Sequence, residues 1–354
     1  MKKEYQIAVF PGDGIGPEVV AEGLKVLKRV AEIEGFTYKL THYPHGSEHY
    51  LKTKELFPDP VLNELKQQDA IYLGAIGDPR VEVGLVERAV IAGIRFGLDL
   101  YVNLRPIKLL AEHLCPLKDK KPEDIDMVVV RENTEDLYAG IGGFLKKGTP
   151  DEVALQEMVF TRKGCERVIR YAFDLASKRR KKLTLVDKAN AIRAMDIWTR
   201  TFAEVGKEYP QVAADHAYID AACMWLVKNP EQFDTVVTSN LFGDILTDLG
   251  AVLQGGMGIA ASGNIHPGRV SMFEPIHGSA PKYRGKEVAS PVAAIAACGM
   301  MLEYLGETRA AERMEKTIAE LLKTKKIPSL DSSSGLSTSA CGDLIARQLS
   351  EARL

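Results

Sequence analysis

The sequence has no long apolar run and no excess of either charge. No window approaches the roughly 18 apolar residues of a membrane span, and the first residues, MKKEYQIAVFPGDGIG, are too poor in apolar residues for a signal peptide. The 46 Lys and Arg nearly balance the 48 Asp and Glu, so nothing attracts the chain generally to nucleic acid or to an anionic membrane. These absences predict a cytoplasmic protein whose partners are small molecules.

Cysteine is scarce and unpaired. Five cysteines are scattered along the chain without any CxxC pair, which argues against a disulfide framework and against a thiolate metal site. Cys341 lies in a serine-rich stretch, but no histidine is placed to activate it as a nucleophile. We expect the cysteines to be buried or functionally indifferent thiols.

Strand-like and helical segments alternate along the chain. Apolar cores that run into polar or glycine-rich residues occur in YQIAVF, DAIYLGAIGDP, DMVVVREN, KLTLVDKAN and DTVVTSNLFGD. Helical patterns lie between them, including residues 161–177 and 191–209. This alternation predicts an α/β protein with functional groups at strand ends. A length of 354 residues favours two lobes.

The strongest local signal is a pair of aspartates in NLFGDILTD. Asp244 and Asp248 are four residues apart, so a helix would place both carboxylates on one face. Alternatively, Asp244 caps the helix and Asp248 is merely solvated. The apolar neighbours Ile245, Leu246 and Leu249 favour a metal site, because two like charges on a half-buried helix need a cation. Oxygen ligands suit Mg²⁺ or Mn²⁺.

Three further residues are ambiguous when taken singly. Asp220 opens an apolar helical stretch, where an aspartate is ordinarily an N-cap. Lys188 directly follows an apolar strand, where desolvation could make a lysine a general base, although the residue taken singly favours a surface lysine. Tyr138 stands next to a glycine-containing turn and could simply be packed with its hydroxyl at the surface.

Arginines and glycine loops suggest an anionic ligand. Arg95, Arg105 and Arg131 would suit a di- or tricarboxylate if they converged. The glycines of PGDGIGPE do not match the GxGxxG dinucleotide fingerprint and could serve only a tight turn. The loops HGSAPKYRGK and GGMGIAASGNIHP could contact phosphate and adenosine, or could be plain loops.

Taken together, these segments resemble the isocitrate and isopropylmalate dehydrogenase family of β-decarboxylating dehydrogenases. The matching segments occur in the family's order along almost the whole chain: PGDGIGPEV, LDLYVNLRP, VVVRENTEDLYAGI, VDKAN, DHAYIDAA, FDTVVTSNLFGDILTDL and MFEPIHGSAP. The resemblance implies a non-Rossmann doubly wound α/β fold in two domains with a cleft between them. Residues 1–102 and 254–354 would form a large cofactor-binding domain, and residues 103–253 a small domain with the substrate and metal residues and the interface of a homodimer.

The resemblance also implies roles for individual residues. Arg95, Arg105 and Arg131 would bind the carboxylates of a malate-type substrate. Asp244 and Asp248 of one subunit and Asp220 of the other would hold Mg²⁺ or Mn²⁺. Lys188, also reaching across from the partner, would accept the hydroxyl proton, and Tyr138 would protonate C3 after decarboxylation. Residues implied to contact the cofactor are Gly74, Ala75, Asn190, Glu274, His277, Gly278, Lys282, Tyr283 and Ser290.

The segment before Arg95 would contact the third substituent of the substrate and so determine which substituted malate is bound. An isocitrate enzyme is expected to place a Ser and an Asn here, whereas this segment offers Val90, Ile91 and Ala92. An apolar segment fits an alkyl group, so 3-isopropylmalate is favoured, with Ile91 as a contact. RENTEDLYAGI looks more like isocitrate enzymes, and isocitrate, homoisocitrate, tartrate and D-malate remain alternatives.

The cofactor, NAD or NADP, stays open on the sequence. NAD-dependent relatives tend to carry an Asp after HGSAP, where it would repel a 2′-phosphate. Lys282 and Tyr283 occupy that place here and resemble NADP-dependent isocitrate enzymes. A further Tyr and Arg that such enzymes supply near the carboxyl terminus are not found, and Ser290 replaces an expected Asn.

A rival interpretation is a non-catalytic regulatory subunit of such a dehydrogenase. A regulatory subunit is expected to lose the metal aspartates, the lysine or the tyrosine, yet all are present here. A plain phosphate-binding module built on the glycine loops would leave the carboxylates and arginines unexplained. The sequence therefore favours an enzyme.

Overall fold

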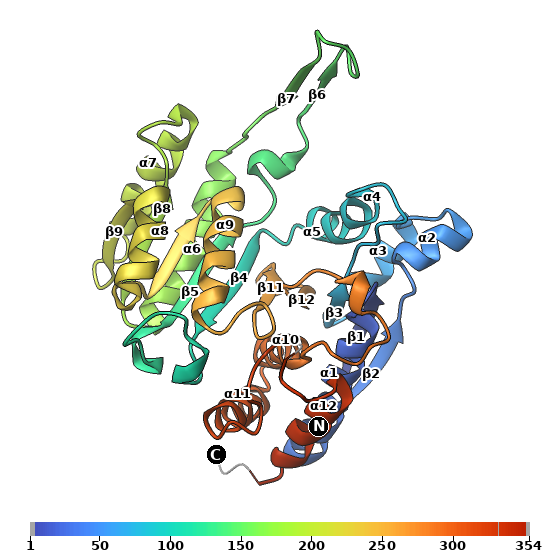
Figure 1. Cartoon of the computed structure of the whole chain (residues 1–354). Helices are drawn as coiled ribbons and strands as arrows, with labels where there is room; N and C mark the ends of the chain where they lie inside the picture. The colour runs from blue at the N-terminus through green and yellow to red at the C-terminus, as the bar shows by residue number, and fades with distance from the viewer. Residues whose placement is uncertain (1–3, 332, 352–354) are drawn as a thin grey trace. The chain divides into compact units, whose positions relative to one another are not determined.

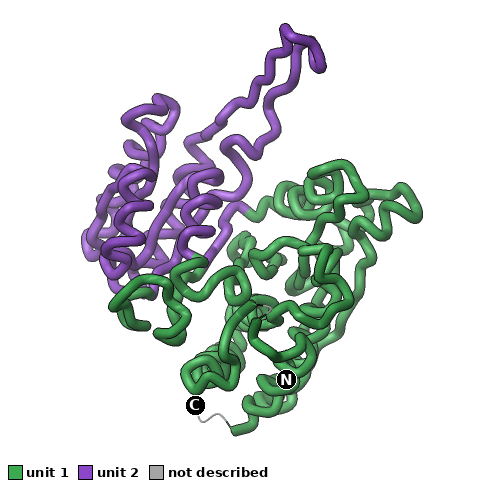
Figure 2. Tube along the Cα trace, viewed as in Figure 1, with its two compact units in different colours: residues 1–100, 106–125, 251–354 green, residues 101–105, 126–250 purple. Residues whose placement is uncertain are grey.

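The computed structural model describes residues 4–331 and 333–351, and the chain divides into two compact units (Figure 2). Unit 1 is built from residues 1–100, 106–125 and 251–354, and unit 2 from residues 101–105 and 126–250. The chain therefore passes between the units several times. No described helix is both long enough and apolar enough to cross a membrane.

Unit 1 is a layered α/β structure. Its strands follow the order β2-β1-β3-β12-β11; β1 pairs in parallel with β2 and β3, and β11 runs antiparallel to β12. The strand bounds are β1 (Glu4–Gly12), β2 (Thr37–His42), β3 (Ala70–Ala75), β11 (Ala261–Ile265) and β12 (Ser271–Pro275).

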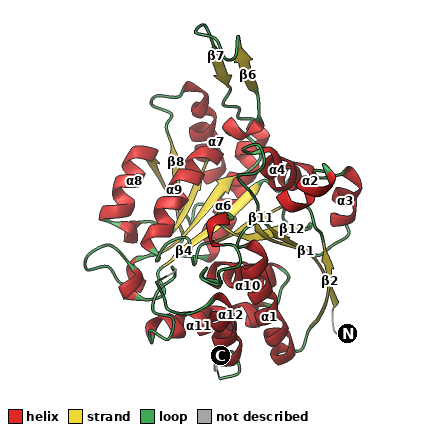
Figure 3. Cartoon of the chain, turned by 45° about the vertical axis from the view of Figure 1, so that its right-hand side comes forward, coloured by secondary structure: helices red, strands yellow, loops and turns green. Residues whose placement is uncertain are grey.

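Both faces of these strands are covered, as the alternation in β1 shows. Tyr5, Ile7 and Val9 lie in one apolar core, whereas Ala8 and Phe10 lie in another. The first core packs against α1 (Gly16–Glu34), α10 (Val292–Tyr304), α11 (Thr308–Lys323) and α12 (Thr338–Gln348), which lie together in Figures 1 and 3. The second packs against α3 (Asp59–Leu65), α4 (Leu85–Glu87), the π-helical turn η1 (Arg88–Ala92) and α5 (Gly93–Gly97). The expected doubly wound α/β class is confirmed.

Unit 2 is also an α/β structure. Its strands follow the order β4-β5-β10-β8-β9, with β5, β10, β8 and β9 mutually parallel. These strands are β4 (Val102–Lys108), which begins in unit 2, β5 (Asp126–Glu132), β8 (Lys182–Asp187), β9 (Ala213–Tyr218) and β10 (Thr235–Thr238). The helices are α6 (Arg162–Lys178), α7 (Asp196–Gly206), α8 (Ile219–Lys228) and α9 (Asn240–Leu253).

A two-stranded hairpin extends from unit 2. It consists of β6 (Gly142–Leu145) and β7 (Val153–Gln156), which pair antiparallel and project away from the rest of the unit (Figure 1). Every residue of both strands is exposed, including Phe144, Leu145 and Leu155.

The predicted helix at residues 191–209 is partly wrong. The chain there forms a short 3₁₀ turn, Arg193–Met195, and α7 begins only at Asp196. Residues 188–192 instead form a turn directly after β8, closed by hydrogen bonds from the backbone N–H groups of Ala191 and Ile192 to the carbonyl of Lys188. This turn begins at Lys188, the first residue after β8.

Candidate active site

A charged cluster in unit 2 brings together four of the residues singled out in the sequence. Asp244, on α9, is bonded through Oδ1 to the Arg131 guanidinium, and NH2 of Arg105 lies 3.5 Å from the same oxygen. The Tyr138 hydroxyl donates to Oδ2 of Asp244 at 2.9 Å. The Arg131 guanidinium lies 5.5 Å from the centre of the Tyr138 ring. Arg105, Arg131, Tyr138 and Asp244 therefore form one site.

Polar neighbours hold the two buried arginines in place. Arg105 donates through Nε to Asn103 and through NH1 to Thr247, both at 2.6 Å. Arg131 donates through Nε to Asn240 at 3.0 Å. Fixed, desolvated guanidinium groups bind a carboxylate more strongly than flexible surface cations do.

A glycine in α9 lets Arg131 approach the helix. A Cβ on Gly243 would lie 2.4 Å from Cγ of Arg131, far inside van der Waals contact. Any side chain at this position would push Arg131 away from Asp244. The glycine of NLFGD is therefore part of the site, a role that the sequence alone did not reveal.

The two aspartates of α9 differ in electrostatic environment. Burial would raise the pKa of Asp244, but the charges of Arg131 and Arg105 and the Tyr138 hydrogen bond bring it below its ordinary value. Burial and the nearby Asp244 charge raise the pKa of Asp248. Asp244 lies inside α9, so the interpretation of Asp244 as a cap is wrong.

The donor set fits a hard divalent cation. Asp244 and Asp248 lie one helical turn apart, and repulsion between them opposes ionisation of Asp248. A cation between carboxylate oxygens would remove this repulsion, and an all-oxygen set suits Mg²⁺ or Mn²⁺. Among the described residues of one chain, however, Asp220 does not join Asp244 and Asp248 in a group close enough to share an ion.

Lys188 and Asp220 form a second cluster in unit 2. Lys188 follows β8 directly, Asp220 lies in the first turn of α8, and Nζ of Lys188 donates to Oδ1 of Asp220 at 2.6 Å. The hydrogen bond from Lys188 lowers the pKa of Asp220, which is therefore ionised near neutral pH. The Asp220 side chain is 69% exposed, so its carboxylate can reach a ligand outside its own chain.

Two predicted residues of unit 1 contact each other. Arg95, at the end of α5, donates through NH2 to Oε1 of Glu274 on β12 at 2.9 Å. Asn264 donates to the same oxygen at 2.8 Å. The predicted substrate residue and the predicted cofactor residue are thus joined directly.

Ile91, the residue predicted to contact the third substituent of the substrate, lies in the π-helical turn η1 and is partly buried against the apolar core. Such turns are frequent at functional sites.

The glycine turn after β1 lies against the end of β3. A Cβ on Gly74 would lie 2.2 Å from the Pro11 carbonyl, and the backbone N–H of Asp13 donates to the Ala75 carbonyl at 2.6 Å. Gly12 has φ +79°, a left-handed conformation that glycine adopts without strain. Gly12 therefore has a conformational role in the turn that follows β1.

Asp13 is a central residue of unit 1 that the sequence did not single out. Its buried carboxylate accepts hydrogen bonds from the backbone N–H and hydroxyl of Ser47 and from the backbone N–H of Gly77. One side chain thus joins three segments that are distant in the sequence. An aspartate between two glycines is ordinarily a turn residue, so only the folded structure shows this role.

The other predicted cofactor residues of unit 1 lie in or near the HGSAP segment. Burial lowers the pKa of His277, so its ring is neutral near pH 7. Lys282 is exposed, and its Nζ lies 4.8 Å from the centre of the Tyr283 ring. The Ser290 hydroxyl donates to the Gly258 carbonyl at 3.3 Å. Gly278 of this loop and Asn190, which lies in unit 2, are both exposed.

The cysteines are as expected from the sequence. Cys165, Cys298 and Cys341 are buried, and Cys115 and Cys223 are partly buried, with none in a disulfide. Burial raises the pKa of Cys341 to about 12. A thiol that stays protonated is a poor nucleophile, so Cys341 is not suited to nucleophilic catalysis.

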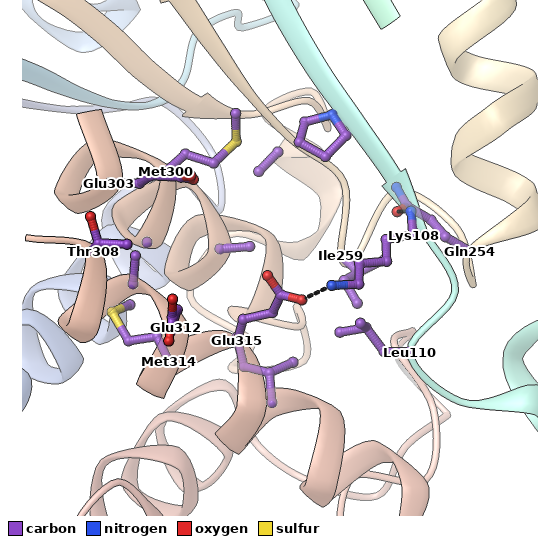
Figure 4. A pocket seen from close by; sticks show the side chains of 16 residues that line it. Lys108, Leu110, Gln254, Ile259, Met300, Glu303, Thr308, Glu312, Met314 and Glu315 are labelled. Atoms are coloured by element: carbon purple, nitrogen blue, oxygen red, sulfur yellow. Dashed lines mark hydrogen bonds and ion pairs between the residues drawn. The ribbon is translucent and has the colours of Figure 1, made fainter. Parts of the chain in front are cut away.

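An apolar cavity in unit 1 is separate from all these residues (Figure 4). It has a volume of about 230 Å³ and is lined by residues such as Ile259, Met300, Met314 and Glu303, with the Lys108–Glu315 ion pair beside them. None of the site residues predicted from the sequence lines it. The cavity is therefore not the candidate active site.

A buried glutamate next to Arg131 makes stability depend on pH. Burial raises the pKa of Glu132 to about 7 from an ordinary value of 4.5, although Thr134 and Glu135 donate hydrogen bonds to it. The folded state therefore binds this proton more tightly than the unfolded state does. The resulting stabilisation is complete below about pH 4.5 and is lost as pH rises through about 7.

Glu132→Gln is expected to flatten the pH dependence of the free energy of unfolding between about pH 4.5 and 7. Urea unfolding at several pH values measures this slope. Glu157→Gln, an exposed glutamate of the same unit, should leave the slope unchanged. A Glu132→Gln slope equal to that of the wild type would show that Glu132 does not titrate in this range.

Comparison with known proteins identifies relatives along nearly the whole chain. The family model described as Isocitrate/isopropylmalate dehydrogenase matches residues 6–345. A 3-isopropylmalate dehydrogenase from Thermobifida fusca is 51% identical and covers 99% of each chain. One from Corynebacterium glutamicum is 49% identical, over 97% of this chain and 99% of the relative. The crystal structure of an isocitrate dehydrogenase from Methylococcus capsulatus is 36% identical, with a TM-score of 0.88 over 98% of this chain and 99% of that one.

Proposed function

Because the chain belongs to the isocitrate/isopropylmalate dehydrogenase family, we propose that it oxidises and decarboxylates 3-isopropylmalate with NAD and a divalent metal ion, as a cytoplasmic enzyme of leucine biosynthesis. The observation that carries the proposal is the cluster in which Arg105, Arg131 and Tyr138 surround Asp244. A regulatory subunit would not be expected to retain this cluster. The substrate follows from the relatives named 3-isopropylmalate dehydrogenase.

In this proposal, the residues of unit 2 bind the substrate and move its protons. Arg105 and Arg131 hold a carboxylate, and Arg95 of unit 1 is a further substrate ligand on family grounds. Lys188 accepts the proton of the C2 hydroxyl, and Tyr138 donates a proton to C3 after carbon dioxide leaves. A divalent ion, when bound, makes the hydroxyl more acidic and stabilises the negative charge that develops on its oxygen.

We propose that the metal ligands come from two copies of the chain. Asp244 and Asp248 would act with Asp220 of a second copy, since Asp220 does not approach them within one chain. The exposed apolar side chains of unit 2, including Phe144, Leu145 and Met224, support a homodimer, because a partner subunit would cover them. Lys188 is bonded to Asp220 and would therefore enter the partner's site together with it.

Unit 1 would bind the nicotinamide cofactor. Gly74 and Ala75 at the end of β3 would lie against it, together with Glu274, His277, Gly278, Lys282, Tyr283 and Ser290, and Asn190 of unit 2 would add a contact. The partly buried, neutral His277 has a buried ring nitrogen, Nε2, without a hydrogen-bond partner, which suits a polar ligand. The cofactor, when bound, accepts the C2 hydride.

A substrate panel tests the proposed specificity. Ile91, the side chain that would contact the third substituent, is apolar and only partly buried, whereas Val90 is fully buried in the core. An unpaired carboxylate against Ile91 would be poorly solvated. We expect kcat/KM for 3-isopropylmalate to exceed that for isocitrate, homoisocitrate, tartrate and D-malate. A higher kcat/KM for any of these four would replace the proposed substrate.

The metal requirement gives a further prediction. After exhaustive chelation the enzyme is expected to be inactive, and Mg²⁺ or Mn²⁺ should restore turnover. Asp248→Asn should raise the Mn²⁺ concentration needed for half-maximal activity by at least about tenfold, because a charged ligand is lost. Asp196→Asn, which removes an exposed ion pair with Arg200 on α7, is the control. Full activity of the chelated enzyme would exclude the metal site.

Lys282 tests discrimination between the cofactors. If an NADP 2′-phosphate meets Lys282, the contact contributes about 1.5–3 kcal/mol, or roughly one to two decades of affinity. Lys282→Asp should therefore lower kcat/KM for NADP by that factor and change it little for NAD. Lys286→Asp, an exposed lysine four residues further on, is the control. An unchanged ratio of the two kcat/KM values would show that Lys282 does not recognise the 2′-phosphate on the adenosine ribose.

A further inference from the structure

A second cluster of metal-ligand type lies in unit 1, among residues that the proposed mechanism does not use. His45, His49 and Glu55 each offer one ligand atom, and these atoms lie within 4.8 Å of one another. Nε2 of His49 lies 2.9 Å from Oε2 of Glu55, and the two imidazole rings are 5.0 Å apart. It is the one group of three such ligands within the described residues, 4–331 and 333–351.

The local fold brings the three side chains together. His45 precedes α2 (Ser47–Thr53), and His49 lies in the first turn of that helix. Lys54 ends α2 with φ +64°, a left-handed conformation that turns the chain back. The backbone N–H of Glu55 then donates to the Thr53 hydroxyl at 3.1 Å, so the Glu55 carboxylate is directed toward His49.

His45 has a buried ring nitrogen without a hydrogen-bond partner. The residue is 94% buried among the rings of Phe10, Tyr43 and Phe57, and its Nδ1 has no hydrogen-bond partner. Buried polar nitrogens without a partner are rare in native proteins, so this atom calls for an explanation. Burial lowers the pKa of His45, with a smaller contribution from His49, so the neutral imidazole is available as a ligand.

We propose that His45, His49 and Glu55 bind a Zn²⁺-class cation, separately from the Mg²⁺ or Mn²⁺ of the active site. Two imidazoles and one carboxylate are a donor set of zinc proteins, whereas hard ions prefer all-oxygen sites. In tetrahedral zinc, donor atoms lie roughly 3.3–3.6 Å apart, which small side-chain rotations reach from the present spacing. The fourth position is left for water, because Glu55 lies at the surface.

The bound ion would fix the segment from His45 to Glu55. On the same helix, Glu48 forms ion pairs with Arg80 and with Arg284, the latter at 2.7 Å. Arg284 directly follows the Lys282–Tyr283 pair. A cation at this site would therefore stabilise the part of unit 1 that contacts the HGSAP loop.

Zinc titration of the metal-free full-length protein tests the proposal. With excess Mg²⁺ present to fill the carboxylate site, competition with a chromophoric chelator measures Zn²⁺ affinity. We expect one Zn²⁺ per chain that Mg²⁺ does not displace. His49→Gln should weaken binding by at least about 100-fold, because loss of a ligand exceeds the 10–100-fold effect of losing its outer partner. His42→Gln, an exposed histidine outside the cluster, should bind as the wild type does.

Two further measurements keep the result decisive. Co²⁺ should give the intense visible absorption of a four-coordinate site, and that absorption should be absent from His49→Gln. Glu55→Gln, at an exposed position, provides the same test if His49→Gln does not fold. Wild-type zinc affinity in both variants, or no binding tighter than that of denatured protein, would overturn the proposal.

Discussion

Lys188→Met is expected to lower kcat by about 100-fold to 10,000-fold, the usual contribution of a general base. The lysine lies directly after β8, bonded to Asp220, and methionine replaces its aliphatic chain without supplying an amine that accepts a proton. The loss should fall mainly on kcat, because other residues bind the substrate. Steady-state kinetics with saturating metal and cofactor measure it.

Two other variants separate proton transfer from the ion pair. Lys188→Arg retains a cation beside Asp220, but a guanidinium cannot release its proton at accessible pH, so kcat should fall as in Lys188→Met. Lys182→Met removes an ion pair with Asp215 on the same two strands, at their other end, and should leave kcat unchanged. Wild-type turnover in Lys188→Arg would rule out Lys188 as the base.

Tyr138→Phe is expected to reduce kcat by about 100-fold or more, on the scale of general acid catalysis. The variant keeps the ring that lies beside Arg131 and removes only the hydroxyl that donates to Asp244 at 2.9 Å. Proton donation to C3 should therefore slow, whereas hydride transfer in a single turnover should be affected less. Rapid mixing with observation of NADH separates these steps.

Tyr209→Phe is the matched control for Tyr138. The Tyr209 hydroxyl also donates to an aspartate, Asp174 on α6, at 2.9 Å, but Tyr209 lies in the loop after α7. Removing it should leave every kinetic step as in the wild type. Equal losses in the two variants would mean that Tyr138 acts through folding, and normal turnover of Tyr138→Phe would remove it from the mechanism.

The fold class was predictable because each strand carries its own signal. Buried parallel strands appear as short apolar runs, so KLTLVD and DMVVVRE were recognised without knowledge of their neighbours. The start of α7 was missed because ANAIRAM has helical composition, whereas its backbone closes a turn after Lys188. Turn formation after a strand depends on where the strand ends, which composition does not specify.

The site was predictable only in part. Asp244 and Asp248 could be paired from their spacing, but the convergence of Arg105 and Arg131 on Asp244 depends on strand order. The need for Gly243 arises from one close approach to Arg131. Asp13 was missed for a similar reason, because its partners Ser47 and Gly77 lie far along the chain.

The measurement that tests the central claim most directly is the stoichiometry of a single reaction. Purified enzyme, 3-isopropylmalate, NAD and Mn²⁺ are combined, and NADH and released carbon dioxide are measured together. We predict one NADH and one carbon dioxide for each substrate consumed, and neither product after chelation. NADH formation without carbon dioxide, or both products at an undiminished rate after chelation, would contradict metal-dependent oxidative decarboxylation.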